Sequence, residues 1–498
     1  MHEKFVVTAA YPFIPAEINM AHIASTYLPA DIYYRFLKQL DLDVVFVSAT
    51  DVHGIMIKKL FEDSKDGTEE IILRYHKEYE KQFDKMGIYF DEYNRTDTDE
   101  VKKLVYSSLD NLYSKNLIYK KCSKNYLCMK CGEVLPKHYR IEAKGRTETN
   151  KMILKGEERY RCYFCGSPDI VERVCEHWFL KFDEETKSII NRVIELQSNK
   201  FVREYLESIL KKGLKDWDFT RDNHYGIEMP AFYQDVELKQ YIYLWFESLI
   251  SYLSLFHYHP EEHVFIKHFM SKNIVYYHGI IWPVLLYLGM KGTDNFEVQI
   301  STKGFLNIKS SDKEMVDIDT TTKKYSKDYI RFYIIYLVKD NITDFYFKNN
   351  KFTEIINSIL CKQLGGFFKR CRNIIYKYNC LQVPQGDFED CKFKELIQSY
   401  KCNYKSIEVN ALLMDAIGYI KYCGKVIETK KIYINPTKKL LEELCYLMAG
   451  ALLLMKGVIP DIIEEYNIFK EFDLTSYSSI AGLKGRKIIK KEEEWKQL

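Results

Sequence analysis

The sequence predicts an α/β protein in which a parallel sheet carries an inserted, cysteine-bearing domain and is followed by an α-helical bundle. Three observations support this prediction. Short apolar segments such as Phe5–Ala10 and Val44–Ser48 alternate with helical periodicity, which is typical of a parallel sheet with crossover helices. Between about 117 and 230, cysteine pairs, charge runs and short β-like segments interrupt that pattern. After Asn349 the apolar spacing is almost wholly helical.

Length and composition indicate a large folded protein. The 498 residues correspond to about two to four domains. A hydrophobic content of 47%, with only 22 Gly and 11 Pro, excludes a disordered or collagen-like chain. The 73 Lys and Arg nearly balance the 70 Asp and Glu, for a net charge of +3. Any binding of RNA must therefore depend on local patches and shape.

No segment predicts a membrane span or a leader peptide. Leu444–Met455 is too short, and Ile274–Met290 is interrupted by His278, whereas a bilayer requires about 20 apolar residues. The N-terminus has no apolar run of signal-peptide length. The 13 cysteines, an odd number without a secretion signal, favour a reducing compartment. We expect a cytoplasmic protein with no membrane partner.

The first strand-to-helix junctions are the first places to look for a site. The strand Phe5–Ala10 leads through a proline-containing loop into a helix predicted over about Ile18–Lys38. The second strand ends at the polar turn Thr50–Gly54. Because ligands bind at the carboxyl ends of parallel strands, we expect chemistry in residues 9–22 and 48–54.

The later changes of pattern divide the chain into four parts. Alternation of strands and helices resumes at about 236–345, with Val264–His268 as a candidate strand. The bundle helices are predicted over Thr353–Tyr378, Lys405–Thr429 and Pro436–Val458. The four predicted parts are residues 1–116, 117–235, 236–345 and 346–498.

Two close cysteine pairs, Cys128-x-x-Cys131 and Cys162-x-x-Cys165, lie in the inserted part. Each offers two thiolates from one tight turn, and together they complete the tetrahedral set of a structural zinc. The 30 residues between them exceed the usual spacing of about 15–20, so a loop must project between the pairs. A redox pair, or four incidental cysteines, is the alternative. Cys122 and Cys175 are expected to be buried structural thiols.

A series of short motifs accompanies these features. They are Thr50-Asp-x-His-Gly54, the CxxC insert, Gly213-Leu-Lys-Asp-Trp217, Trp245-Phe246 and Tyr277-His278-x-x-x-Trp282-Pro283. In this order and spacing they resemble methionyl-tRNA synthetase, a family of class I aminoacyl-tRNA synthetases, over about residues 5 to 460.

The resemblance gives each part of the chain an expected role. Residues 1–116 and 236–345 would form a Rossmann-type catalytic domain, the latter with a stem-contact segment. Residues 117–235 would be a connective insertion with a zinc knuckle, and 346–498 a helical domain like those that bind anticodons.

The resemblance also implies an activity. It is that of an ATP-dependent ligase, which activates methionine, or a close analogue, to an aminoacyl adenylate and transfers it to tRNA. ATP with Mg²⁺ would be a substrate, and Zn²⁺ a structural cofactor. Two alternatives stay open. One is a specialised paralogue that passes the acyl group to a non-tRNA amine or an unusual tRNA. The other is a weakened methionine-binding regulator.

The resemblance implies an amino-acid pocket. Asp51 matches the carboxylate that holds the substrate ammonium, a charge-assisted contact. The wall around the thioether, where sulfur–aromatic contacts favour methionine, is matched by Tyr11, Phe13, Trp245, Tyr252 and His278. Tyr11 is bulkier than the aliphatic residue usual in the family. Taken alone, each aromatic residue could equally fill the core.

Two signatures that meet the ATP phosphates are altered. In place of H-I-G-H the chain has Asn19-Met20-Ala21-His22, so His22 remains while Asn19 can donate a hydrogen bond but carries no charge. In place of K-M-S-K-S, after Gly304-Phe305-Leu306, stand Lys309 and Lys313, four apart instead of three. We expect these four side chains, Asn19, His22, Lys309 and Lys313, to be the catalytic residues, with slower chemistry than an unaltered site.

The anticodon-binding end is altered as well. The Arg of the family's helix matches Arg370, but its Asn matches Gly366. None of the five tryptophans lies near Lys431–Ile432, where the family's stacking Trp is expected. A stacked base contributes about 1–3 kcal/mol, so anticodon recognition would require another ring, for which a nearby tyrosine is the alternative.

Overall fold

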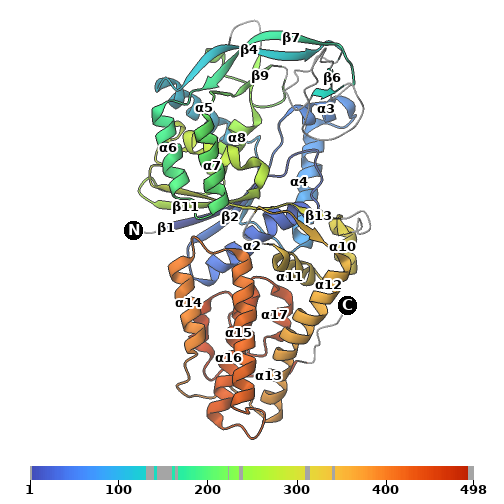
Figure 1. Cartoon of the computed structure of the whole chain (residues 1–498), viewed down its shortest axis with the longest axis vertical. Helices are drawn as coiled ribbons and strands as arrows, with labels where there is room; N and C mark the ends of the chain where they lie inside the picture. The colour runs from blue at the N-terminus through green and yellow to red at the C-terminus, as the bar shows by residue number, and fades with distance from the viewer. Residues whose placement is uncertain are drawn as a thin grey trace.

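The centre of the computed structural model is a five-stranded parallel sheet with the strand order β12-β11-β1-β2-β3 (Figure 1). Its strands are β1 (Glu3–Ala9), β2 (Val44–Thr50), β3 (Glu92–Arg95), β11 (His263–Ser271) and β12 (Phe296–Lys303). The structure describes residues 3–130, 140–142, 160–162, 166–222, 224–234, 239–308, 315–338 and 342–491. The predicted parallel sheet is confirmed.

The order in which the chain adds strands to the sheet reverses at β1. It steps from β1 to β2 and β3 on one side, then returns to β11 and β12 on the other. Phe5 pairs with Val44 of β2 and with Phe265 of β11. The topological switch point therefore lies beside the carboxyl end of β1, where the N–H of Ala10 donates 2.9 Å to the carbonyl of Phe269.

The first part of the chain, up to residue 116, contains the predicted helix and three more. The predicted helix comprises α1 (Met20–His22), the π-helical η1 (Ile23–Tyr27) and α2 (Leu28–Gln39), and the others are α3 (Ile55–Asp63), α4 (Thr68–Lys85) and α5 (Asp99–Ser114). The helix predicted over Ile18–Lys38 begins at Met20, because Asn19 is its extended N-cap. The start of α5 is fixed likewise by Thr98, whose hydroxyl accepts from the N–H of Val101 at 3.3 Å.

The insertion contains both strands and helices. Its strands are β4 (Ile118–Cys128), β5 (Arg140–Glu142), β6 (Tyr160–Cys162), β7 (Ile170–Leu180), β8 (Trp217–Asp218), β9 (Thr220–Asp222) and β10 (Gln240–Ile242). β7 pairs antiparallel with β4 along all eleven residues and with β8 at its end. Its helical elements are α6 (Glu184–Glu195), α7 (Lys200–Lys212) and the short η3 (Ala231–Tyr233). The sequence pattern missed α6 and α7, whose apolar faces are narrow stripes among charges.

The two extra cysteines of the insertion have different environments. Cys175 is buried, as expected, but Cys122 is exposed, so that expectation was wrong. Cys122 lies in the part of β4 where successive residues are solvent-exposed, because this part of the β4–β7 pair extends beyond the hydrophobic core.

The returning half of the sheet is built largely from short helical turns. These are α8 (Leu244–Ser251), η4 (Tyr252–Ser254), η5 (Lys272–Ile274), η6 (Tyr277–Ile281), α9 (Trp282–Val284) and η7 (Leu285–Gly289). After β12 come β13 (Leu306–Ile308), α10 (Ile318–Lys324), α11 (Lys327–Leu337) and β14 (Phe345–Phe347). The predicted strand Val264–His268 is the centre of β11.

The rest of the chain is a helical bundle on the side of the sheet opposite the insertion (Figure 1). It comprises α12 (Asn349–Ile355), η9 (Ile356–Gly365), α13 (Gly366–Lys377), α14 (Cys391–Asn403), α15 (Val409–Thr429), α16 (Lys438–Lys456), α17 (Pro460–Tyr466) and η10 (Tyr477–Leu483). The predicted bundle is confirmed, although the second predicted helix begins at Val409 rather than Lys405. In the part of the chain that the structure describes, no helix is both long and apolar enough to cross a membrane.

A buried arginine, Arg331, pairs with an acid of the sheet domain and also bonds to the bundle. Arg331 of α11 is fully buried and donates 2.7 Å to Oδ2 of Asp31 in α2. The same guanidinium donates to the carbonyls of Met86, Gly457 and Val458. Because removing one partner of a buried pair leaves an uncompensated charge, its loss would cost about 3–5 kcal/mol. The bundle is thus joined to the sheet domain through the buried guanidinium of Arg331.

Candidate active site

The candidate site lies where the switch point predicts it, at the carboxyl ends of β1, β2 and β11. Tyr11 follows β1, Asp51 follows β2, and α8 with η4 supplies Trp245 and Tyr252. The loop after β1 is bound to the end of β2: Asp51 N–H donates 2.8 Å to the carbonyl of Pro12, and Ile14 N–H donates 3.2 Å to the carbonyl of Asp51. The fold thus brings two junctions that are distant in the sequence together.

Asp51 is a buried carboxyl group with two hydrogen-bond donors. Ser248 Oγ donates 2.7 Å to its Oδ2, and the N–H of His53 donates 3.4 Å to its Oδ1. Burial, together with the nearby carboxylate of Glu247, raises the pKa of Asp51 to about 7. An ammonium placed here would supply the missing positive charge and favour the ionised form.

Next to Asp51 lies a buried histidine–glutamate pair. Nδ1 of His53 is 2.5 Å from Oε1 of Glu247, and both side chains are buried. Burial alone would lower the pKa of His53, but the Glu247 carboxylate outweighs it and raises that pKa above its usual value. Oε2 of Glu247 has no hydrogen-bond partner within the described residues. Sequence reasoning missed Glu247, although it directly follows the Trp245-Phe246 motif.

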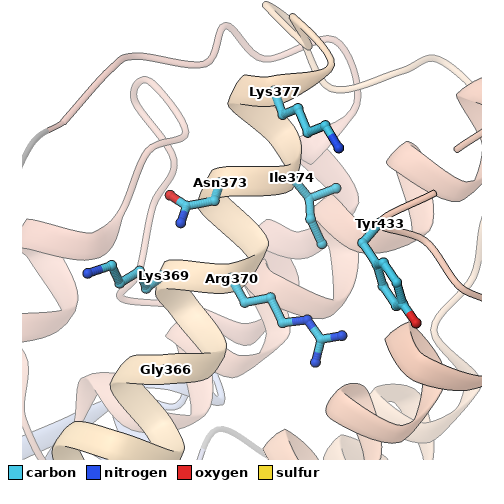
Figure 2. A pocket seen from close by; sticks show the side chains of 7 residues that line it. All are labelled: Gly366, Lys369, Arg370, Asn373, Ile374, Lys377 and Tyr433. Carbon is cyan, nitrogen blue, oxygen red and sulfur yellow. The ribbon is translucent and has the colours of Figure 1, made fainter. Parts of the chain in front are cut away.

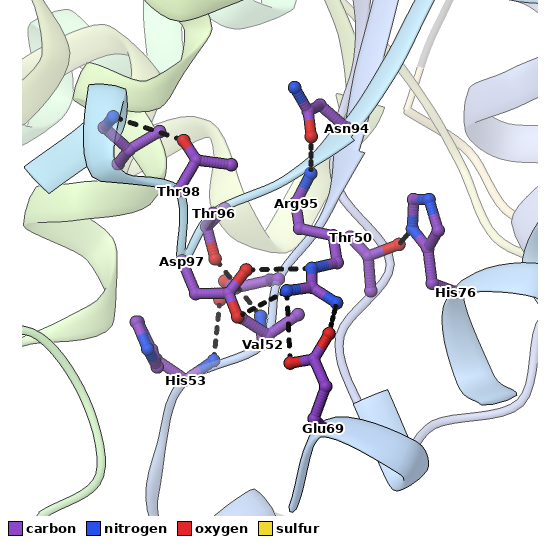
Figure 3. A network of polar contacts seen from close by, with 12 residues as sticks. Thr50, Val52, His53, Glu69, His76, Asn94, Arg95, Thr96, Asp97 and Thr98 are labelled. Atoms are coloured by element: carbon purple, nitrogen blue, oxygen red, sulfur yellow. Dashed lines mark hydrogen bonds and ion pairs between the residues drawn. The ribbon is translucent and has the colours of Figure 1, made fainter. Parts of the chain in front are cut away.

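A polar network joins the turn after β2 to the end of β3 (Figure 3). The N–H of Val52 donates 3.2 Å to the hydroxyl of Thr96, which follows β3. Arg95 donates to Asp97 at 3.0 Å and to Glu69 at 2.6 Å. The carboxyl ends of β2 and β3 are therefore joined by side chains as well as by the sheet ladder, so the site stands on fixed backbone.

The wall beside Asp51 consists of Tyr252 and His278, which are buried, and Tyr11, which is partly buried. The rings of Tyr11 and Tyr252 are 4.5 Å apart, and the Tyr252 hydroxyl lies 3.2 Å from Nε2 of His278. Burial lowers the pKa of His278 to about 4, so its imidazole is neutral at pH 7. Its Nδ1 lies 3.2 Å from the carbonyl of Ile274, which only a protonated nitrogen can approach as a donor. Nε2 therefore accepts from Tyr252.

Trp245 stands at the open side of this wall. It is half-buried and stacks in parallel on Tyr277, with 4.2 Å between ring centres and 5° between planes. The ring centres of Trp245 and His278 are 6.1 Å apart, and the two rings are nearly perpendicular. Phe13, by contrast, is 50% exposed, and its ring is not part of the buried wall. Tyr277 was part of a recognised motif but was not predicted as a site residue.

The structure adds His268 beneath the wall, which sequence reasoning missed. His268 on β11 is the register partner of Thr8 on β1, and its Nδ1 lies 2.6 Å from the Thr8 hydroxyl. Its ring is 4.8 Å from that of Tyr252 and 5.2 Å from that of His278. Only the strand pairing, which the sequence does not specify, identifies this contact.

At the predicted phosphate end, Asn19 has a structural role. Its Oδ1 accepts from the N–H groups of Ala21 at 3.0 Å and His22 at 3.3 Å. In return Asn19 N–H donates 3.2 Å to Nδ1 of His22, which closes a capping box. Nδ1 of the exposed His22 thus accepts, and Nε2 is left to carry the proton. Lys309 and Lys313 lie outside the described residues.

Half of the predicted zinc set is described. Cys128 ends β4 and Cys162 ends β6, and both are fully buried although their neighbours Met129 and Arg161 are exposed. The N–H of Gly166, a residue with φ +69°, donates 2.9 Å to the Cys162 carbonyl. Buried thiols at the ends of two strands fit ligands of a structural zinc. Cys131 and Cys165 lie outside the described residues.

The predicted anticodon face is a pocket of about 320 Å³ on α13 (Figure 2). It is lined by Gly366, Lys369, Arg370, Asn373, Ile374, Lys377 and Tyr433. The guanidinium of Arg370 lies 5.3 Å from the ring centre of Tyr433 and 2.6 Å from Oε1 of Glu428. The structure therefore brings a tyrosine ring to Arg370 in a chain that has no tryptophan there. Basic side chains beside a partly exposed ring are typical of surfaces that bind single-stranded nucleic acid.

Comparisons with known proteins agree with this geometry. A family model described as tRNA synthetases class I (M) matches residues 5–372. The methionine–tRNA ligase of Methanobrevibacter smithii is 32% identical over 430 residues, which cover 79% of this chain and 63% of that protein. That of Methanopyrus kandleri is 28% identical over 443 residues, covering 81% and 64%. This chain thus spans less than two thirds of the length of each relative.

Solved structures show the same fold. The Mycobacterium tuberculosis methionyl-tRNA synthetase in complex with methionyl-adenylate has a TM-score of 0.77 at 15% identity, over 99% of each chain. The free form of that protein has a TM-score of 0.75, over 100% of this chain and 98% of the other. The Rossmann-type sheet and the helical C-terminal part therefore match throughout, and, with the family match over residues 5–372, the chain belongs to the class I tRNA synthetases (M).

Proposed function

We propose that the chain activates methionine, or a close analogue, with ATP and transfers the resulting acyl group to tRNA. The observation that carries this proposal is the buried carboxyl of Asp51 beside the wall of Tyr11, Tyr252 and His278. A carboxylate without a cation suits an α-ammonium, and rings suit a thioether side chain. The relatives named methionine–tRNA ligase, and the solved synthetase that holds methionyl-adenylate, support the same substrate.

The chemistry follows from this orientation. With its ammonium on Asp51, the amino acid presents its carboxylate to ATP. A carboxylate oxygen forms a bond to the α-phosphorus, and the bond to pyrophosphate breaks. A hydroxyl of the tRNA 3′ end then attacks the acyl carbon and releases AMP. The chain's part is to position the two reactants and to exclude water.

The altered phosphate signatures would assist the departure of pyrophosphate. His22, whose Nε2 carries the proton, can donate to a phosphate oxygen, whereas Oδ1 of Asn19 is occupied as a helix cap. We propose that Lys309 and Lys313 complete the set, with Mg²⁺ bound to ATP. Charge stabilisation of the leaving group is the step these residues would serve.

We propose a structural zinc held by Cys128, Cys131, Cys162 and Cys165. Four thiolates leave no open position for water, so the ion would stabilise the insertion and take no part in chemistry. The proposed division into 1–116, 117–235, 236–345 and 346–498 places this ion in the connective part.

ATP–pyrophosphate exchange with a panel of amino acids, with and without tRNA, tests the proposal. We expect exchange that depends on methionine, followed by acylation of tRNA. Methionine binding without any exchange would contradict it and indicate a regulator.

A second candidate keeps the activation step and changes the acceptor. It is a paralogue that transfers the acyl group to a non-tRNA amine or to an unusual tRNA. The observations that favour it are Gly366 at the anticodon face and Asn19 at the phosphate end. Exchange with methionine, but no acylation of any bulk tRNA, would select this candidate.

A further inference from the structure

A second group of potential metal ligands lies in the insertion, apart from the four predicted zinc cysteines. Cys175 and His177 are two residues apart on β7 and therefore share one face of the strand, and Asp222 comes from β9. The thiol, an imidazole nitrogen and a carboxylate oxygen all lie within 4.8 Å of one another. The three residues are 8%, 1% and 9% exposed.

The histidine is oriented for a ligand. Nδ1 of His177 lies 3.0 Å from Oδ2 of Asp218 on β8 and donates to it. Nε2 is then the nitrogen that faces Asp222, 3.5 Å from its Oδ2, and it makes no well-formed hydrogen bond within the described residues. A buried ring nitrogen without a hydrogen bond is a costly feature unless something binds it.

The carboxylate is held from behind as well. Oδ1 of Asp222 accepts from Nε2 of Gln240 at 3.1 Å, and Gln240 is its register partner on β10. The same Gln240 amide donates 2.6 Å to the carbonyl of Glu176, between the two β7 ligands. One oxygen of Asp222 is thus fixed, while the other faces the thiol and the imidazole.

We propose that Cys175, His177 and Asp222 bind a zinc ion. Thiolate sulfur, imidazole nitrogen and carboxylate oxygen are the three ligand types that zinc takes in proteins. The carboxylate of Asp218 on the far nitrogen of His177 is the outer contact that metal-binding histidines commonly have. Three protein ligands leave a fourth position for water.

Charge favours the divalent ion in this place. One thiolate and one carboxylate cancel the two positive charges of zinc, so the buried site carries no net charge. Zinc–ligand distances of about 2.0–2.3 Å place ligand atoms about 3.3–3.8 Å apart in a tetrahedron. The three ligand atoms lie within 4.8 Å of one another, so small side-chain rotations bring them to these distances.

The test distinguishes the zinc site from two states without metal. In the first, His177 is protonated, because the carboxylates of Asp218 and Asp222 outweigh burial and raise its pKa to about 9. The group would then be a buried ion pair without metal. In the second, Cys175 is a reactive thiol. Burial and Asp222, however, raise the pKa of Cys175 to about 11, so without a cation this thiol is a poor nucleophile at pH 7.

The ion would fix the segment that reaches from the insertion to the candidate active site. Shortly after β9, Tyr225 packs its ring 5.2 Å from that of His53, and its carbonyl accepts from Gly54 N–H at 2.9 Å. Joining β7 to β9 therefore steadies a contact to the turn that carries Asp51. The inference rests on the insertion and does not depend on the proposed function.

Metal analysis of the full chain tests the proposal. We expect Cys175→Ser to lose about one zinc ion per chain relative to the unmodified protein. Cys122→Ser is the matched control, because that thiol is exposed on the neighbouring strand β4, and it should keep the full content. Cys128→Ser should lose a different ion, so the double variant Cys128→Ser/Cys175→Ser should lose both.

Anomalous scattering at the zinc edge from crystals of the unmodified protein covers the case in which Cys175→Ser does not fold. A peak between Sγ of Cys175 and Nε2 of His177 supports the proposal. A folded Cys175→Ser protein with unchanged zinc content, or a map without that peak after growth with zinc, overturns it in favour of the ion pair.

Discussion

The hydroxyl of Ser248 donates a hydrogen bond of 2.7 Å to Oδ2 of Asp51, and a second acid, Glu247, is buried nearby. Among the described residues, the cation beside these two carboxyl groups is His53, and its ring pairs with Glu247 rather than with Asp51. Asp51 is therefore left with hydrogen-bond donors but no ion-pair partner in the described structure. An incoming ammonium completes the charge balance, and this makes the site's affinity sensitive to pH.

Methionine should bind more tightly as pH rises from about 6 to 8. Only the ionised form of Asp51 pairs with the ammonium, and its pKa is raised to about 7. Below this pKa, each pH unit should weaken binding by up to about tenfold. Isothermal titration calorimetry at several pH values measures it. A Kd that stays constant over this range would contradict the assignment of Asp51.

Asp51→Asn should abolish methionine binding while stabilising the unliganded chain at high pH. The folded-state pKa, about 7, exceeds the usual 3.8, so the folded chain holds the extra proton between these values. Stability is then lost as pH rises through that window, by up to about 4 kcal/mol at pH 8. The amide removes this loss. Thermal unfolding at pH 5 and pH 8 compares the proteins, and the exposed Asp63→Asn serves as control.

Ser248→Ala should weaken methionine binding by about ten- to a hundredfold, the effect of one hydrogen bond to a charged group. Without the Ser248 hydroxyl, the ionised form of Asp51 loses one of its two donors. Ser254→Ala is the matched control, because the Ser254 hydroxyl donates to the Ser251 carbonyl and not to Asp51. Equal affinities of the two variants would show that Ser248 does not support the carboxylate.

Much of the fold could be predicted because its signals are local. The cores of β1 and β2 are runs of apolar residues bounded by polar turns, and helical periodicity marks the bundle. Helices α6 and α7 were missed because only a few buried residues, such as Val193 and Leu206, stand among many charges. Burial of Cys122 was wrongly expected, since distance from the core is not visible in a sequence.

The candidate site could be predicted only where a motif carries it. Asp51, Trp245 and His278 belong to recognisable motifs, so it could be predicted that they lie close together in the fold. His268 and Glu247 could not, because their contacts with Thr8 and His53 depend on strand register and helix placement. The contact of Arg370 with the ring of Tyr433 likewise depends on how two separate segments pack.

Asn19→His combined with Ala21→Gly should raise the rate of adenylate formation by one to a few orders of magnitude, about the effect of a well-placed donor. The same change should lower stability by about 1 kcal/mol, because Oδ1 of Asn19 caps the N–H groups of Ala21 and His22. Asn19→Ala separates the effects, since it loses the cap without adding a donor. Pre-steady-state adenylation measures the rate.

If the double variant gains nothing while the unmodified protein turns over ATP rapidly with an amino acid and an acceptor, the altered signature is suited to another reaction geometry. The acceptor proposed as tRNA would then give way to the second candidate.

Tyr433→Ala should weaken tRNA binding by about 1–3 kcal/mol, which is the contribution of one base stacked on an aromatic ring. The ring stands beside Arg370 in the α13 pocket, where the chain has Gly366 in place of a side chain that could read a base (Figure 2). Tyr433→Phe keeps the ring and should bind normally. Tyr422→Ala removes an exposed ring that does not line this pocket, so it controls for a general loss of aromatic surface.

Methionine-dependent exchange without tRNA should be unchanged in all three variants, because the pocket lies in the bundle and not at the strand ends. Filter binding with bulk tRNA measures the affinities; equal binding by Tyr433→Ala and the unmodified chain would show that Arg370 and Tyr433 do not form an RNA site.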